Sequence, residues 1–350
     1  MLLANVETCL LLIVILLDNK RIYAETFTLG YITGSKRHLG DYVYHRPGFQ
    51  ISAAITLAVE QVNAGELGRR GHNLDFLVAE TFGEEETSIL MTADLWTKNV
   101  SAYIGPQETC IHEGRMAAAF NIPMISYFCT HNETSNKKEF PTFARTRPPD
   151  TQISKSLLSV LLAFNWTKVT FMHMNSTMFE FNKMSTIATT ILTSFEAAGI
   201  SVNHRRSWNE PYYGATHMKN PFHEHVKQTY RETRIYVILG HYYEHMGLLM
   251  ALDEMNLLEK GEYWVVGVDI EQYDEKRPSK YLRGLWQKKT DLSVVNAYRN
   301  YFSIVASAPI NFTNFTQLVN EYRQKPPFNF TNPLANVGGI VQVTKIQSVK

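Results

Sequence analysis

The residues of this sequence whose types and spacing could do chemistry gather in YIGPQETCIHEGRMAAAFNIPMISYFC, from Tyr103 to Cys129. Cys110 and Cys129 lie near its two ends, and His112 follows the first cysteine. A catalytic thiol needs a general base beside it and a depressed pKa. His112 is close in sequence, but nothing else supports a nucleophile. A disulfide is the alternative, and the choice depends on how the surrounding elements place the two thiols.

A second pattern, His241-Tyr242-Tyr243-Glu244-His245, matches H-x-x-E-H. In zinc peptidases of that type, one helix presents two histidines to a single metal ion. The alternative function is therefore a secreted zinc-dependent hydrolase that uses His241 and His245. Against it, His241 directly follows a strand that ends at Gly240, and no distant acidic ligand is identifiable. The chain has no nucleotide-binding glycine loop and no nucleophile elbow. We expect no catalytic residue, no metal and no cofactor.

Alternating strands and helices must position these residues. Short β-rich runs alternate with helical patterns from Phe27 onward, and this spacing is typical of βαβ units and parallel sheets. The expected strands are FTLGYI, NLDFLVAE, SAYIG, PMISYF, KVTFMHM, ISVNHRRSW, RIYVILG, EYWVVGVD and YFSIVASAP. The longer segments between them carry helical periodicity. The sequence therefore predicts an α/β fold in which each parallel sheet is flanked by helices.

The topology bears directly on the two cysteines. Both strands of a parallel βαβ unit end at the same edge of the sheet, and each cysteine comes just after such a strand. Neighbouring strands lie about 4.8 Å apart, and a disulfide needs Cα atoms roughly 4.4 to 6.8 Å apart. We therefore expect a disulfide between Cys110 and Cys129, which closes a loop of about 20 residues and contributes on the order of 3 kcal/mol.

The polar loop GPQET lies at the same edge. Ligands of open α/β sheets bind beyond the carboxyl ends of the strands, and free N–H groups at a helix N-terminus favour anionic groups. The candidate ligand-binding residues are Pro106, Gln107, Glu108, Thr109, Ser126 and Tyr127. The alternative is a solvated loop capped by Thr109.

The chain divides at RTRPPD, where two prolines resist helix and favour a stiff crossing. We expect a signal peptide over 1–24, lobe 1 over 25–147, lobe 2 over 148–298, and a return segment towards lobe 1 over 299–350 that is incomplete. The whole chain has 350 residues, which is enough for two such lobes.

Several features predict export. CLLLIVILL, at Cys9 to Leu17, fits the apolar core of a signal peptide with cleavage after Ala24, and the alternative is a buried N-terminal strand. Seven sequons are an excess over the roughly three expected by chance. Their asparagines are Asn99, Asn132, Asn165, Asn175, Asn311, Asn314 and Asn329. A net charge of +1 with scattered Lys and Arg gives no sign of a nucleic-acid partner.

Two blocks of sequence, YIGPQETCIHEGRMAAAFNIPMISYFCTH and FPTFARTRPPDTQISKSLLSVLLAFNWTKVTF, resemble the extracellular ligand-binding region of receptor guanylyl cyclases. Insect members are the most similar; natriuretic peptide receptors, and the Venus-flytrap modules of GABA-B and metabotropic glutamate receptors, are more distant. The resemblance spans Phe27 to about Gly339 and implies a two-lobed periplasmic-binding-protein-like module. It also implies a dimeric ectodomain on the outer side of the plasma membrane, with a ligand that is often a peptide.

Two departures from the family pattern matter. In natriuretic peptide receptors a Gly-Pro-Gly-Cys loop holds a chloride, whereas here Gln107-Glu108 follow Gly105-Pro106, so chloride binding is not expected to carry over. The cysteine pairing also differs from the vertebrate pattern. Relatives continue with a helix, a membrane span and a cyclase, whereas this chain ends at VTKIQSVK. We therefore expect a truncated or alternatively spliced, secreted, non-enzymatic ectodomain that binds a peptide or small molecule as a homodimer. A further alternative is an incomplete gene product without a function of its own.

Overall fold

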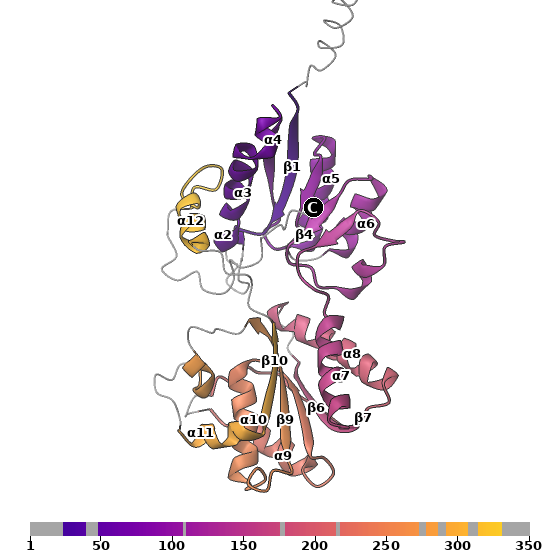
Figure 1. The fold of residues 1–350 in the computed structure, drawn as a ribbon, viewed down its shortest axis with the longest axis vertical. Coiled ribbons are helices and arrows are strands. Elements are labelled where there is room, and N and C mark those ends of the chain that lie inside the picture. The colour runs from indigo at the N-terminus through magenta and orange to yellow at the C-terminus, as the bar shows by residue number, and fades with distance from the viewer. Residues whose placement is uncertain are drawn as a thin grey trace, which may run out of the picture. The chain divides into compact units, whose positions relative to one another are not determined.

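Two compact units make up the chain in a computed structural model, which describes residues 24–39, 48–107, 110–175, 179–214, 218–272, 278–285, 292–306 and 314–330. The first unit combines Met1–Cys129, Asn136–Thr146 and Asn314–Lys350. The second combines Thr130–Ser135 and Arg147–Thr313. The expected signal peptide lies almost wholly outside the described residues, and Ala24 is the first of them. Each unit contains a sheet with helices beside it (Figure 1).

The first sheet is entirely parallel, with the order β2-β1-β3-β4-β5. Its strands are β1 (Thr26–Thr33), β2 (Asn73–Glu80), β3 (Ala102–Ile104), β4 (Met124–Ser126) and β5 (Phe143–Arg145). In this register Tyr31 of β1 lies opposite both Val78 of β2 and Ile104 of β3. The carboxyl ends of the strands therefore meet at one edge.

Helices cover both faces of the first sheet. They are α2 (Gly48–Ile51), α3 (Ala53–Ala64), α4 (Glu66–Arg69), α5 (Glu85–Thr97), α6 (Ile111–Ala119) and α12 (Phe315–Tyr322). Leu95 of α5 and Ala117 of α6 are buried with Tyr103 against one face. Ile51 and Ile55 pack against the opposite face. Helix α12 packs on the outer side of α3, where Val319 is buried with Ala53, Ala54 and Leu57.

The second sheet repeats this plan. It is parallel, with the order β10-β9-β8-β6-β7. Its strands are β6 (Lys168–Met174), β7 (Ser201–Trp208), β8 (Ile235–Leu239), β9 (Trp264–Gln272) and β10 (Tyr301–Ala306). Strand β8 is buried along its whole length, as a central strand covered on both faces must be. Strand β7 alternates exposed and partly buried residues, which suits an edge.

Helices again lie on both faces of the second sheet. The helices of this unit are η1 (Asn132–Ser135), α7 (Thr151–Ala163), α8 (Phe179–Ala197), α9 (Phe222–Thr229), α10 (Tyr242–Glu254), η2 (Pro278–Leu282), α11 (Leu292–Ala297) and η3 (Tyr298–Asn300). Leu157 of α7 and Ile187 of α8 pack against Phe171 on one face. Val226 of α9 and Leu248 of α10 pack against the other.

The α/β class, with two helix-flanked parallel sheets, is confirmed. The nine strands named above are all present, whereas β5 and the short helices α4 and α11 carry no period long enough to predict. A further strand is expected within FNFTNPLANVGGIVQV, nearly all of which lies outside the described residues. The lobe boundaries expected at 147 and 298 stay predictions. Strand β10 lies past residue 298, in the segment expected to return to the first lobe, and it pairs with β9 of the second sheet.

In the part of the chain that the structure describes, no helix combines the length and apolar character needed to cross a bilayer.

Candidate functional site

The strand order points to one place in each sheet. Numbered along the chain within each unit, both sheets read second, first, third, fourth, fifth strand. In this doubly wound order the connections reverse direction between the first and third strands, and ligands bind outside the carboxyl ends at that switch point. The candidate positions are the ends of β1 and β3 in the first unit, and the ends of β6 and β8 in the second.

A buried polar cluster fills the switch point of the first unit. Tyr31 Oη donates a hydrogen bond to Ser52 Oγ over 3.1 Å, and Ser52 Oγ lies 3.1 Å from Thr33 Oγ1. Thr33 Oγ1 donates to Gln107 Oε1 over 3.4 Å, while Gln107 Nε2 donates to the Gly34 carbonyl over 3.5 Å. Burial raises the pKa of Tyr31, which therefore remains a neutral donor. The cluster ties β1 to the loop after β3.

The next strand holds that loop from its other side. Ser126, at the end of β4, donates from Oγ to the Pro106 carbonyl over 3.0 Å and accepts from the Cys129 N–H over 3.0 Å. Gly105 has a φ of +120°, and a Cβ there would lie 2.4 Å from the Ile32 carbonyl oxygen. The close approach of two strand ends therefore requires glycine at this position.

The structure brings together four of the predicted ligand-binding residues. Pro106, Gln107, Ser126 and Tyr127 all lie at the carboxyl edge of the first sheet, and all four are buried in the chain alone. Tyr127 donates to the Ile32 carbonyl over 3.1 Å and stacks on Tyr31. These side chains hold the edge in shape. Glu108 and Thr109 lie outside the described residues, and their role in ligand binding stays a prediction.

The disulfide lies at this same edge. Cys110 and Cys129 are bonded, with their Cα atoms 5.9 Å apart, as the βαβ topology predicts. Both are buried in the core of the first unit. His112, the base considered for a catalytic thiol, instead has Nδ1 2.6 Å from Glu85 Oε1 at the surface.

Sequence reasoning missed the polar residues that gather around the carboxyl end of β1. Thr33 and Ser52 belong to the buried cluster, and Glu80 accepts from the backbone N–H of Ser35 over 2.8 Å. One signal for them was present, because β1 and β3 were expected in one parallel sheet, where the carboxyl ends of the strands meet at the same edge. Thr33 and Ser35 are separated by one residue, and this pattern matches no chemical motif.

The second unit has a buried carboxylate at its switch point. Glu244 Oε1 accepts from Trp208 Nε1 over 2.8 Å and from the Tyr212 N–H over 3.4 Å. Its Oε2 accepts from the His241 N–H over 3.0 Å. A Cβ on Gly240 would lie 2.6 Å from Glu244 Oε2, so only glycine admits the carboxylate this close to the strand end. Burial raises the pKa of Glu244, and its hydrogen bonds and His241 oppose that rise. The carboxylate joins the ends of β7 and β8 to α10.

Aromatic side chains cluster at the first turn of α10, which carries this carboxylate. The ring of His241 stacks on Tyr243 with centroids 5.2 Å apart, and Tyr213 lies 5.6 Å from Tyr243. Tyr242 meets Tyr281 edge to face at 5.3 Å, and Lys280 Nζ lies 4.9 Å from the Tyr281 centroid. Tyr213, His241, Lys280 and Tyr281 are partly exposed. We call Tyr213, His241, Tyr242, Tyr243, Lys280 and Tyr281 the aromatic edge.

The structure gives no support to the zinc hypothesis for His241 and His245. His241 is the residue before the first turn of α10, whereas His245 is fully buried, with Nδ1 2.8 Å from Tyr301 Oη. Burial lowers the pKa of His245 to about 3. Glu244, the acid of the motif, is engaged by Trp208 and the backbone. No group of three metal-binding side chains occurs among the residues described.

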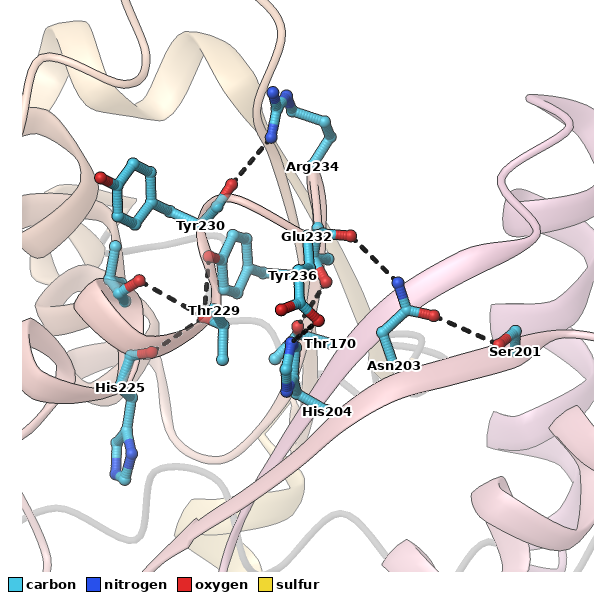
Figure 2. A network of polar contacts seen from close by, with 12 residues as sticks. Thr170, Ser201, Asn203, His204, His225, Thr229, Tyr230, Glu232, Arg234 and Tyr236 are labelled. Atoms are coloured by element: carbon cyan, nitrogen blue, oxygen red, sulfur yellow. Dashed lines mark hydrogen bonds and ion pairs between the residues drawn. The ribbon is translucent and has the colours of Figure 1, made fainter.

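The amino ends of the second sheet carry a different polar network (Figure 2). Thr229 Oγ1 lies 3.0 Å from Tyr236 Oη, and Asn203 Nδ2 donates to the Glu232 carbonyl over 3.0 Å. His204 Nε2 lies 3.0 Å from Glu232 Oε2. These contacts join the end of α9 to β7 and β8. The polar residues at these amino ends therefore stabilise the fold.

Comparison with known proteins agrees with this geometry. The family described as "Receptor family ligand binding region" matches residues 50–344. The chain is 29% identical over 325 residues to the receptor-type guanylate cyclase Gyc76C of Drosophila melanogaster, covering 89% of this chain and 20% of that protein. It is 30% identical over 239 residues to the resact receptor of Arbacia punctulata, covering 65% of this chain and 23% of the relative.

A third relative is the speract receptor of Strongylocentrotus purpuratus, 31% identical over 237 residues, with 65% of this chain and 20% of that protein covered. The chain thus spans about a fifth of the length of these relatives. The matched residues take in β2 to β10 and the switch point of the second unit, whereas β1 of the first sheet precedes them. The chain therefore belongs to the receptor family ligand binding region.

Proposed function

We propose that this chain is the extracellular ligand-binding region of a receptor guanylate cyclase and that its ligand is a peptide. The observation that carries the proposal is the family match over residues 50–344, together with relatives that are themselves receptors for resact and speract. In this role the chain binds and does not catalyse. Its site is extracellular, and it acts as a homodimer.

The two switch points support different parts of this role. In the first unit the buried cluster of Thr33, Ser52 and Gln107 holds the strand ends rigid. In the second unit the aromatic edge offers partly exposed rings and one ammonium group. Rigid tyrosines supply large contact area at low entropic cost. Lys280 supplies a cation for a peptide carboxylate. The second unit therefore contributes the direct contacts in this proposal.

A chimeric receptor tests the function. The chain is fused to the membrane span and intracellular part of the resact receptor and expressed in cultured cells. Synthetic resact, synthetic speract and peptide fractions from the organism's own tissues are applied while cyclic GMP is measured. The expected result is a rise in cyclic GMP that protease treatment of the active fraction abolishes. The unmodified resact receptor with resact is the positive control.

Site variants make the test specific. Tyr213→Ala and Tyr281→Ala remove partly exposed rings of the aromatic edge and should lower the potency of the active fraction about tenfold each, because each loses contact worth about 1.4 kcal/mol. Tyr230→Ala, at the amino end of the same sheet, is the matched control and should leave potency unchanged. A chimera that reaches the cell surface yet responds to no peptide fraction would refute the proposed function.

A further inference from the structure

An exposed aromatic cluster lies at the amino ends of the strands of the second sheet. The aromatic edge lies at the opposite, carboxyl ends. Phe164 and Trp166 follow α7, Trp264 begins β9, and Phe302 is the second residue of β10. Ring centroids lie 4.8 Å apart for Phe164–Trp166, 5.5 Å for Phe164–Phe302, and 5.2 Å for Trp264–Phe302. We call these four residues the aromatic patch.

Solvent reaches this patch in the chain alone. Phe164 is 53% exposed, the neighbouring Leu162 is 51% exposed, and the other three rings are only partly buried. Strand β10 is also the edge of the sheet as described. Exposed apolar surface beside an open strand edge favours association, and soluble proteins usually cover such edges. Something is therefore expected to cover the patch.

A sequon lies within the patch itself. Asn165-Trp166-Thr167 places the asparagine between the two stacked rings of Phe164 and Trp166. Asn165 is exposed, and its backbone N–H donates to the Leu162 carbonyl over 3.0 Å. Its φ of +55° ends α7. Asn121 and Asn256 end other helices with φ of 54° and 55° but are not sequons, so this conformation alone indicates only a helix stop.

We propose that Asn165 carries an N-linked oligosaccharide whose first sugars pack over the aromatic patch. Transfer joins the Asn165 amide nitrogen to the anomeric carbon of the first N-acetylglucosamine. The bond from that carbon to a lipid-linked pyrophosphate donor breaks, and the amide proton leaves with the pyrophosphate. Ring faces carry negative potential and attract the C–H groups of a sugar. The outward hydroxyls remain hydrated, so the sugar covers the rings without creating a new apolar surface. The proposal rests on the export of the chain.

The first unit repeats the arrangement. Asn99 also ends a helix with a positive φ, 56°, in the sequon Asn99-Val100-Ser101. Trp96, three residues earlier, is 47% exposed and stacks on Phe120 with centroids 4.6 Å apart. Each unit therefore has a sequon beside an exposed aromatic stack at the amino ends of its strands. In each unit this leaves the carboxyl edge, where ligands are expected, free of that glycan.

The test uses the full chain secreted from eukaryotic cells with high-mannose glycans. Mass spectrometry of glycopeptides measures occupancy at Asn165. An endoglycosidase then trims each glycan to one N-acetylglucosamine, and acrylamide quenching of tryptophan fluorescence reports ring exposure. We expect Asn165 to be occupied and the trimmed protein to be quenched like the untrimmed one. Thr167→Ala, which removes the sequon, should raise the quenching constant, whereas Thr167→Ser should not.

Two controls assign the signal to the patch. In a Trp166→Phe/Trp264→Phe background the rings remain but the reporters are gone, so the effect of Thr167→Ala should disappear. Sedimentation identifies any dimer of the Thr167→Ala chain. An unoccupied Asn165 would overturn the proposal, as would unchanged quenching in Thr167→Ala. Unchanged quenching together with a dimer would show that a second copy covers the patch in place of a sugar.

Discussion

Glu244 shows how one buried side chain sets the shape of a switch point. Burial raises its pKa above the unfolded value of about 4.3. Because the folded chain then holds the proton more tightly, the contribution to stability is complete below the unfolded pKa and is lost as the pH rises through the folded pKa. Glu244→Gln should remove that pH dependence and, by weakening a buried hydrogen bond, cost about 1 to 3 kcal/mol at low pH.

Urea unfolding at a series of pH values from 4 to 8 measures this effect. Glu259→Gln, an exposed acid just beyond the same helix, is the control and should follow the wild type. If the free energy of unfolding of Glu244→Gln changed with pH as steeply as that of the wild type, Glu244 would be ionised throughout this pH range.

The contribution of His245 to the free energy of unfolding should depend on pH in the opposite direction to that of Glu244. Its folded pKa of about 3 lies well below the unfolded value of about 6.5. The neutral ring therefore contributes stability that is present above pH 6.5 and lost as the pH falls towards 3. His245→Gln should reduce the acid sensitivity of the free energy of unfolding, while His38→Gln, at an exposed position, should not. Added zinc should leave the melting temperature unchanged, and a zinc-dependent rise lost in His245→Gln would contradict this assignment.

The histidine pair also shows why spacing alone misleads at this scale. Residues four apart share a helix face whether that face meets solvent, a metal or the core. Here this face packs into the core, where His245 contacts Tyr301, which is 56 residues away in the sequence. No local pattern reports such a partner, so the motif could not distinguish a metal site from a buried side chain.

At the scale of elements, the disulfide holds two strand ends across helix α6. Replacing both Cys110 and Cys129 by serine should lower the free energy of unfolding by on the order of 3 kcal/mol, because the unfolded chain regains the entropy of a 19-residue separation. Urea unfolding of the variant and of reduced wild type should agree. Two free thiols in a non-reducing mass measurement of the secreted protein would contradict the bond.

Elements with a clear period were predictable from sequence, and those without one were not. The segments that form β7 and β8 were both predicted as strands, and their burial in the structure reflects an edge and a central position. Strand β5 has three residues, and its pairing with β4 supplies what its own sequence lacks. The same reasoning placed Gln107 at the sheet edge, but its burial depends on Thr33, 74 residues away, and so was not predictable.

At the scale of the molecule, the first unit includes a segment that follows the second unit in the sequence. Helix α12 is packed on α3 although more than 250 residues separate them. Arg323 is buried, donates from Nε to the Phe49 carbonyl over 3.0 Å, and places its guanidinium 4.5 Å from the Phe49 centroid. The sequence analysis predicted a segment that returns towards the first lobe over 299–350. It gave no sign that an arginine would be the buried contact, because its partner is 274 positions away.

Arg323→Gln should therefore destabilise the first unit specifically. The loss of a buried charge-assisted hydrogen bond and of the cation–π contact should cost about 2 to 3 kcal/mol. Lys325→Gln is the matched control, because Lys325 lies over the ring of Tyr322 at the surface, where such a contact contributes about 0.5 to 1 kcal/mol. Hydrogen exchange, read separately for β1 and β8, should show faster exchange in β1 only. Equal acceleration in both strands would mean that α12 stabilises the two units together, and that the chain unfolds as one cooperative body.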